Sequence, residues 1–252
     1  MKVLYVFIFL LASCTAGAST ITVLTHNAED SLFRDEDGET KGIKHSGRRA
    51  FTYELAKDMM QRMNLMGEIK NVPLSRGLHL ITHKDNYALF HVAWTKKRAT
   101  KFKWVGPIIS NKMYIYKNSS NIVESASLND LDLNSRFCLV RHSITSEIVA
   151  AHGMRNIVKA TNYKSCFKML AAGRVDYTSI ADNDFNWLKS KLTPSSLHQI
   201  QRTNVMLGET EGFIAFSKNV SDDEIDRWQA SLDHIKASGR YQQLVDEFLY
   251  GE

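Results

Sequence analysis

The sequence lacks the common signatures of metal-dependent and nucleophilic enzymes. Its three cysteines, Cys14, Cys138 and Cys166, form no CxxC pair, and its nine histidines include no HExxH motif, which excludes the usual zinc sites. There is also no GxSxG motif and no cysteine with an evident histidine partner, so nucleophilic hydrolysis has no support. We therefore expect neither a metal nor another cofactor.

Long apolar runs, short repeats and charge of one sign are also missing. No segment after residue 18 approaches the roughly 20 apolar residues of a transmembrane helix, and no short-period repeat indicates a solenoid. The 32 Lys and Arg residues exceed the 27 Asp and Glu residues by only 5 and form no continuous run. Dedicated nucleic-acid binding is therefore not expected, whereas a small positive excess suits an anionic ligand.

What is present is the composition of a globular protein. The chain has 252 residues, of which 44% are hydrophobic and 23% charged. This length and balance are enough for one large core or two small ones, and they exclude a disordered or fibrous chain.

Residues 1–18 have the layout of a secretory signal. Lys2 precedes an apolar run over residues 3–12, and small residues come after that run. Because the run is too short to span a bilayer comfortably, we expect the segment to be removed on export. Loss of Lys2 would lower the net charge from +5 to +4.

Two cleavage sites compete within this signal. Ala16-Gly17-Ala18 suits an ordinary signal peptidase, whereas Leu11-Ala12-Ser13-Cys14 resembles a bacterial lipobox, which would attach a lipid to Cys14. The soluble form is favoured because the first expected strand, Ile21-Thr22-Val23-Leu24, begins only a few residues after Cys14 and leaves little flexible linker.

Export would place Cys138 and Cys166 in an oxidising compartment where a disulfide can form. Cys138 lies in an expected strand and Cys166 in an expected helix. Pairing depends on how these two elements pack, so a disulfide and two separate buried thiols both stay open.

Strands and helices alternate along the chain, which predicts an α/β fold. The alternation runs once, passes through an extended crossover segment at 112–116, and then repeats. The chain returns to a strand before two final helices, the first of which starts with a capping box of Ser221 and Glu224. We expect strands at 21–25, 68–72, 88–94, 137–140, near 157, 175–180 and 213–216, and helices after Gly47 and at 76–82, 145–152 and 162–172.

Three segments of the chain carry short motifs. Trp94-Thr95-Lys96-Lys97-Arg98 and Phe102-Lys103-Trp104-Val105-Gly106-Pro107 contain the patterns T-x-x-R and F-x-x-x-x-P. Leu170-Ala171-Ala172-Gly173-Arg174-Val175-Asp176 has the pattern L-x-x-G-R-x-D, and Gly239-Arg240-Tyr241 comes before the last expected helix. Together these segments resemble the signature, the helix-to-strand turn and the G-x-y ending of the bacterial extracellular solute-binding proteins of family 3. Order and spacing extend the resemblance over essentially the whole mature chain.

The resemblance implies a two-lobed periplasmic-binding-protein-like fold. Each lobe would be a sheet flanked by helices, and two crossover hinge strands would join the lobes around a ligand cleft. Lobe 1 would comprise residues 20–110 plus 209–252, and lobe 2 residues 111–208. The implied location is the periplasm, and the implied form is a monomer.

The resemblance also assigns a role to Arg98, which stands where the family's arginine grips the ligand's carboxylate, three residues after Thr95. A guanidinium offers a planar fork of donors that matches two carboxylate oxygens. The alternative is a surface arginine within the basic cluster around residues 96–103.

The sequence departs from the amino-acid-binding pattern at two places. Ala93 stands where a serine hydroxyl is frequent, and Ala181 stands where the acid that pairs with the ligand's α-amino group is frequent. Asp182 comes one position later and is open to two interpretations, a ligand contact or a solvated loop acid.

Further candidates lie at strand ends and helix starts. Arg76 comes after Pro73 in a P-x-x-R pattern and is either a second positive group of the cleft or an exposed arginine. Trp94 is either an aromatic wall or core. The other four are Ser143 and Thr145, as anion donors or helix caps, and His26 and Asn27, at the end of the first strand.

The leading hypothesis is a non-enzymatic binding protein for a small anionic or zwitterionic solute, an amino acid or small carboxylate, that serves a membrane permease of the ABC type. One alternative is a cyclic-acid dehydratase-like enzyme on the same scaffold, with His26 and Asp182 or Glu209 as acid-base groups. Another is a solute sensor that reports to a membrane receptor.

Overall fold

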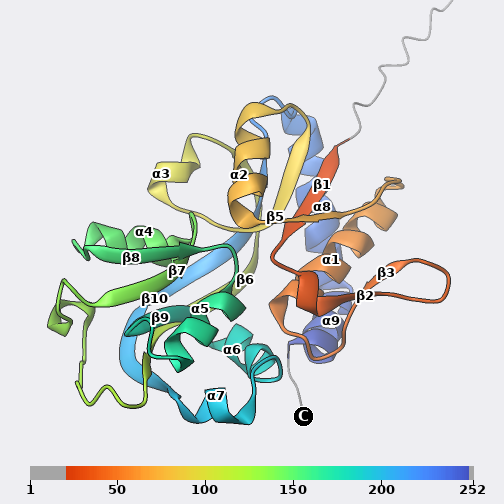
Figure 1. The fold of residues 1–252 in the computed structure, drawn as a ribbon. Helices are drawn as coiled ribbons and strands as arrows, with labels where there is room; N and C mark the ends of the chain where they lie inside the picture. The colour runs from red at the N-terminus through yellow and green to blue at the C-terminus, as the bar shows by residue number, and fades with distance from the viewer. Residues whose placement is uncertain (1–20, 250–252) are drawn as a thin grey trace, which may run out of the picture.

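A computed structural model describes residues 21–249, and its strands and helices alternate as the sequence predicts (Figure 1). The strands are β1 (Thr22–His26), β2 (Leu32–Arg34), β3 (Thr40–Gly42), β4 (Lys70–Val72), β5 (Tyr87–Ala93), β6 (Lys103–Asn118), β7 (Arg136–Val140), β8 (Asn156–Ala160), β9 (Tyr177–Ala181) and β10 (Ile200–Phe216). The α-helices are α1 (Arg48–Arg62), α2 (Leu74–His83), α3 (Lys96–Ala99), α4 (Ile144–Ala151), α5 (Tyr163–Ala171), α6 (Asp182–Lys189), α7 (Pro194–His198), α8 (Asp222–Ala237) and α9 (Arg240–Phe248). The predicted signal segment 1–18 and Cys14 lie outside the described residues.

The main strands form one eight-stranded sheet in the order β4-β1-β5-β10-β6-β9-β7-β8. Parallel pairs stand at its two ends, β4-β1-β5 at one and β9-β7-β8 at the other. We call the first end, with α1, α2, α3, α8 and α9, lobe 1, and the second end, with α4 to α7, lobe 2. The expected arrangement of a sheet flanked by helices in each lobe is confirmed, and the two strands that join the lobes make the sheet continuous through both.

Two long strands make this continuity possible. β6 and β10 pair antiparallel from Ile200 opposite Asn118 to Phe216 opposite Lys103, and they run side by side from one lobe into the other (Figure 1). They match the two expected crossover strands, although both are longer than the predicted segments 112–116 and 213–216. The lobe limits 110/111 and 208/209, which stay a prediction, fall inside these strands.

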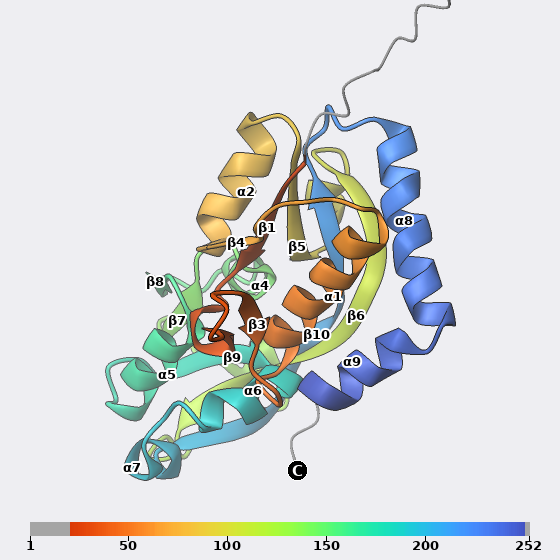
Figure 2. The ribbon, with the colours of Figure 1, turned by 90° about the vertical axis from the view of Figure 1, so that its right-hand side faces the viewer.

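Lobe 1 buries apolar side chains on both faces of its sheet. Helices α1, α8 and α9 cover one face (Figure 2), where Phe51, Phe90 and Trp228 are fully buried. Helix α2 covers the opposite face with Ile81 against Leu89. Helix α1 faces this core with residues four positions apart, because Phe51, Leu55 and Met59 are all buried.

Lobe 2 is covered in the same way. Helices α5 and α6 pack on one face through Phe167 and Leu188, and α4 packs on the other through Val149. The disulfide that the sequence left open is present between Cys138 of β7 and Cys166 of α5, whose Cα atoms are 5.2 Å apart. It therefore ties a central strand of lobe 2 to the helix that covers it.

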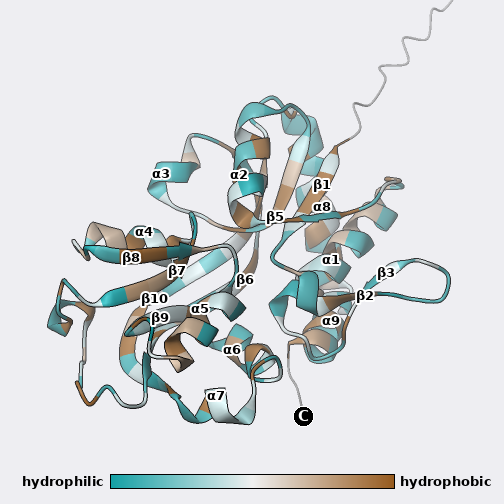
Figure 3. Cartoon of the chain, in the orientation of Figure 1, coloured by the Kyte–Doolittle hydropathy of each residue, from teal (hydrophilic) through white to brown (hydrophobic). Residues whose placement is uncertain are grey.

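Helices cover both faces of the sheet in each lobe, so the strands are expected to be apolar and the surface segments polar. In Figure 3 the short helix α3 and the loop between β2 and β3 are teal, while brown segments run along the strands of the sheet. Between residues 21 and 249 no helix is both long and apolar enough to cross a membrane.

Three local predictions need correction. Ser221 caps α8 by accepting from the Glu224 backbone N–H at 3.3 Å, but the Glu224 carboxylate bonds Arg227 and Trp228 in place of the returning capping-box bond. Asp182, considered as a loop acid, is the first residue of α6. Helices α3, α6 and α7 and the first part of β10 have no counterpart among the predicted elements.

Candidate functional site

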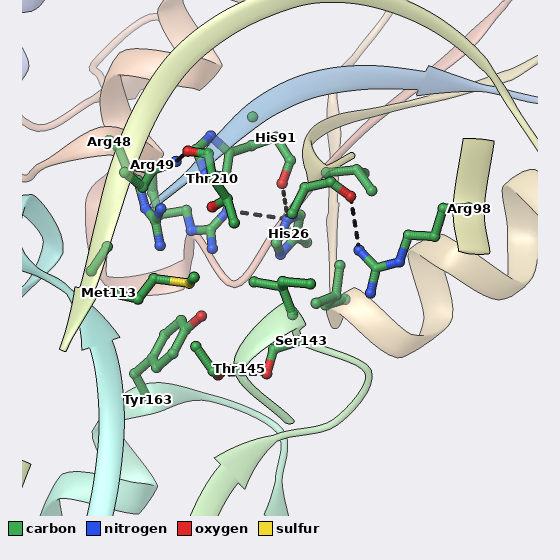
Figure 4. A pocket seen from close by; sticks show the side chains of 17 residues that line it. His26, Arg48, Arg49, His91, Arg98, Met113, Ser143, Thr145, Tyr163 and Thr210 are labelled. Atoms are coloured by element: carbon green, nitrogen blue, oxygen red, sulfur yellow. Dashed lines mark hydrogen bonds between the residues drawn. The ribbon is translucent and has the colours of Figure 1, made fainter. Parts of the chain in front are cut away.

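The lobes meet around a cavity of about 40 Å³, which has room for about three water-sized molecules (Figure 4). Side chains from α1, β1 and β5 of lobe 1 face Ser143, Thr145 and Tyr163 of lobe 2 across this space. The full lining is His26, Arg48, Arg49, Leu74, His91, Val92, Ala93, Arg98, Asn111, Met113, Ser143, Ile144, Thr145, Tyr163, Ala181, Thr210 and Gly212. Three arginines and two histidines thus line the cavity, with no carboxylate among its described lining residues.

Two of the arginines, Arg48 and Arg49, open helix α1 and are only 6% and 5% exposed. Arg48 crosses to lobe 2 and forms a buried salt bridge with Asp184 of α6. Within the described chain Arg49 forms no salt bridge, although its Nη1 lies 3.1 Å from His26 Nε2. Burial, and then the adjacent Arg48 charge, lower the pKa of Arg49 to about 10, so the guanidinium stays charged at neutral pH.

His26 ends β1 at the centre of this group. Its Nδ1 lies 3.1 Å from Asn27 Oδ1, and its Nε2 lies 3.0 Å from the His91 carbonyl oxygen as well as close to Arg49. Arg49 can only donate and the carbonyl can only accept, so Nε2 serves one of them at a time. Burial, and then Arg49, lower the pKa of His26 well below its usual range, so the imidazole is neutral at pH 7.

Three buried polar atoms of lining residues have no hydrogen-bond partner, namely Arg48 Nε, His91 Nδ1 and Asn111 Oδ1. Burial, and then the Arg48 and Arg49 charges, lower the pKa of His91 well below its usual range. Its backbone has a φ of 62°, in the left-handed region that non-glycine residues seldom adopt. Gly212 leaves room for the ring, since a Cβ there would lie 3.0 Å from His91 Cε1. Strained and unpartnered groups of this kind gather at binding sites.

Arg98 lines the cavity, but its guanidinium is already engaged. Nη2 donates to Glu147 Oε1 at 2.5 Å and to the His142 carbonyl at 2.7 Å, both in lobe 2, and Nη1 donates to the Ala93 carbonyl at 3.1 Å. The side chain is 7% exposed, so it is not part of a free basic surface. In this closed arrangement Arg98 bridges the lobes, and its predicted grip on a ligand carboxylate stays a prediction.

Ser143 and Thr145 reach the cavity from the start of α4. Ser143 is the N-cap and accepts from the Ser146 N–H at 3.1 Å, while its Oγ lies 3.0 Å from Thr145 Oγ1. The cap interpretation of Ser143 therefore holds, and both hydroxyls still lie against the cavity. Thr95 does not line it, because its hydroxyl caps α3 by accepting from the Arg98 N–H at 3.2 Å.

Besides Thr95, three further predicted site residues lie apart from the cavity. Arg76 is exposed on α2, Trp94 is 44% exposed in a separate hollow with Trp104, and Asp182 accepts from the Asn183 N–H at the start of α6. Glu209 shares the hollow of Trp94. The structure therefore brings neither Asp182 nor Glu209 into the lining around His26, which leaves the dehydratase-like acid-base arrangement without geometric support.

Asn27 lies at the edge of the cleft and joins the lobes. Its Nδ2 donates to the Thr161 carbonyl oxygen at 2.5 Å, and its backbone has a φ of 53°. A more exposed ion pair of Lys164 with Asp30, at 3.3 Å, also crosses the gap. Together with the Arg48 and Arg98 contacts, these bonds hold the lobes against each other.

The sequence did not single out Arg48, Arg49, His91, Asn111 or Tyr163. One signal was available for the first two, since adjacent arginines in the first turn of a helix oppose the helix dipole, which favours acidic residues there. The other three could not be found from the sequence, because only the packing of the lobes brings them together. In the part of the chain that the structure describes, no three His, Cys, Asp or Glu side chains gather in a metal-binding arrangement.

The arrangement of the chain is shared with solved binding-protein structures. A histidine kinase sensor domain with similarity to periplasmic binding proteins matches with a TM-score of 0.73 and 18% identity, over 89% of this chain and 94% of that one. An arginine-bound substrate-binding protein of an amino acid ABC transporter from Streptococcus pneumoniae matches with a TM-score of 0.70 and 16% identity, over 89% and 92%. The GluR0 ligand-binding core in complex with L-glutamate matches with a TM-score of 0.70 and 13% identity, over 93% and 100%.

The sequence itself matches no protein-family model and no curated protein. Because these sequence identities are low, the similarity to the solved structures shows a shared fold only. The family 3 resemblance is nevertheless confirmed at that level, because similar solved structures include several amino acid-binding proteins of this architecture. The chain has the two-lobed fold of the periplasmic binding proteins.

Proposed function

We propose that this protein is a non-enzymatic binding protein that captures a small solute with an anionic group between its two lobes. The observation that carries the proposal is the interlobe cavity, which three arginines and two histidines line without a carboxylate. A buried positive site of this composition favours a compact negative group, because Coulomb attraction strengthens as closure removes water. The solute would enter while the lobes are apart.

Delivery to a membrane permease of the ABC type is the role that we propose for the captured solute. Solved proteins of this fold include substrate-binding proteins of amino acid ABC transporters, which supports a transport role and a periplasmic or extracellular location. In this proposal the segment 1–18 directs export and the mature protein works as a monomer, with residues 20–110 plus 209–252 as one lobe and 111–208 as the other.

A thermal-shift screen of the mature protein tests solute capture. The panel contains amino acids, mono- and dicarboxylates, polyamines and small cyclic acids. A ligand at 100 times its dissociation constant should stabilise the protein by about 2.7 kcal/mol, and binding should weaken with rising salt because the site is positive. If cationic polyamines bind and none of the anions in the panel binds, the assignment of an anion site is wrong.

A sensory role is the second candidate, because one structural neighbour is a histidine kinase sensor domain. Transport and sensing differ in the event that solute binding triggers. Deletion of the gene should abolish uptake of the identified solute if the protein serves a permease. Unchanged uptake with a lost transcriptional response to the solute would favour the sensor.

A further inference from the structure

The charges around the cavity are not equivalent. Arg48 is paired with Asp184 and Arg98 with Glu147, so each of these guanidinium groups already has a carboxylate partner. Arg49 is equally buried and has none among residues 21–249. A buried charge without a counter-ion is costly, and that cost is relieved when an anion binds beside it. The unbalanced positive charge of the site is therefore centred on Arg49.

The groups around Arg49 can make room for such an anion. His26 Nε2 can accept from Arg49 or donate to the His91 carbonyl, and the second choice leaves the Arg49 Nη1 donor to a ligand. Arg48 Nε and His91 Nδ1 are buried and unpartnered nearby, and Figure 4 shows Arg48, Arg49 and His91 gathered on the same side of the cavity. These groups supply donors for a compact anion such as a carboxylate.

The same cavity offers an ammonium group only uncharged acceptors, such as the unpartnered Asn111 Oδ1, and no carboxylate that would neutralise its charge. Its described lining contains no Asp or Glu, and Ala181 brings a methyl group from the end of β9. Asp184 is used by Arg48, and Glu147 by Arg98. An α-ammonium group would enter beside Arg49 and Arg48, where like charge repels it and no acceptor carboxylate compensates for its lost water.

We infer that Arg49, with His26 and His91, forms the anion-binding centre of this cleft, and that the site selects small carboxylates without an ammonium group over the corresponding amino acids. This inference rests on the proposed function and narrows its substrate class. It also moves the centre of ligand recognition from Arg98 to the first turn of α1.

Matched ligand pairs test the selectivity directly. Each pair differs by one α-ammonium group, as in glutarate and L-glutamate, succinate and L-aspartate, or propanoate and L-alanine. Calorimetric titration of the mature protein should show at least about tenfold tighter binding of the carboxylate without nitrogen in the pair that binds best. Tighter binding of the amino acid in that pair overturns the inference and leaves the proposed function standing. If no compound of the pairs or of the wider panel binds, the proposed function itself fails.

Variants locate the anion centre. Arg49→Met should weaken binding of the best carboxylate by at least about thirtyfold while the melting temperature stays the same or rises, because a buried unpaired charge is removed. The matched control is Arg76→Met, an exposed arginine outside the cavity, which should bind like the wild type. Unchanged affinity in a folded Arg49→Met protein overturns the assignment.

A second variant covers the case in which Arg49→Met does not fold. Ala181→Asp introduces a carboxylate into the cavity lining, and it should lower the affinity for the carboxylate and narrow or reverse the preference within the matched pair. A preference identical to that of the wild type contradicts the inference, because selectivity would then not depend on the charge of the lining.

Discussion

At the scale of single residues, the site is an unusual balance of buried charges. Arg48 and Arg49 are adjacent in sequence, yet one has a carboxylate partner in lobe 2 and the other has a neutral imidazole. His26 and His91 can stay beside these arginines only in the neutral form, because the arginines would repel a further positive charge in the same cavity. The two histidines therefore connect the protonation state of the site with the stability of the fold.

Acidification should destabilise the protein through these histidines. Both native pKa values are lowered, by burial first and by the arginines second, so the native state stays neutral while the unfolded state takes up protons below a pH of about 6.5. Stability that is present above that pH is lost as the pH falls. We expect the melting temperature to drop between about pH 7.5 and pH 5.

The variant His91→Gln, measured by calorimetry over the same range, should show a smaller drop. The exposed His79 of α2 provides the control, and His79→Gln should keep the wild-type pH dependence. Identical profiles for wild type and His91→Gln would mean that this buried histidine does not contribute to acid sensitivity.

At the scale of elements, each lobe depends on helices that cover both faces of its strands. Lobe 2 adds a covalent link, because Cys138 in β7 and Cys166 in α5 are joined across 28 positions of sequence. A crosslink over a loop of this length restricts the unfolded chain by about 3 to 4 kcal/mol in the chain-entropy model. The link therefore stabilises the part of the molecule that supplies Ser143, Thr145 and Tyr163 to the cavity.

Removing the disulfide should lower the free energy of unfolding. We expect the double variant Cys138→Ala with Cys166→Ala to lose about 3 kcal/mol in urea unfolding. A reductant should destabilise the wild type and leave the double variant unaffected. Equal stability of the oxidised wild type and the double variant would show that the link adds nothing to lobe 2.

At the scale of the whole molecule, five polar contacts among the described residues hold the lobes together around a small cavity, and one of them is the bond from Arg98 to the His142 carbonyl. Arg48–Asp184 and Arg98–Glu147 are the more buried ion pairs, and Asn27–Thr161 and Lys164–Asp30 lie nearer the edge. A solute larger than a few water molecules can enter only if these contacts separate. The side chains in these contacts can bond water or a ligand instead of each other. This suits a cleft that opens and closes.

Breaking the Arg98 bridge should favour the open form. In small-angle scattering of the ligand-free protein we expect Arg98→Ala and Glu147→Gln to increase the radius of gyration, because each removes a partner of one interlobe salt bridge. If Arg98 instead serves mainly to grip the ligand, Arg98→Ala will lose affinity while Glu147→Gln binds as well as the wild type. The control Arg136→Gln disrupts a salt bridge with Asp176 that lies within lobe 2, and it should leave the radius unchanged.

The order of elements and the architecture could be predicted from the sequence alone. Local signals carry that information: the apolar spacing of Phe51, Leu55 and Met59, the cap at Ser221, and the motif that ends at Asp176 each act over a few residues. Their order along the chain predicts an α/β unit that repeats, and the family resemblance that they carry implies two lobes joined by two crossover strands.

Which side chains meet between the lobes depends on the tertiary structure. Arg48 and Asp184 are far apart in sequence, as are Arg98 and Glu147, and their pairing depends on how α1, α3, α4 and α6 approach one another. The lobe contact also buries His91 beside Arg49 and leaves Arg76 and Trp94 outside the cavity. Whether a charge is paired, free or desolvated is a property of three-dimensional neighbours, and no spacing along the chain encodes it.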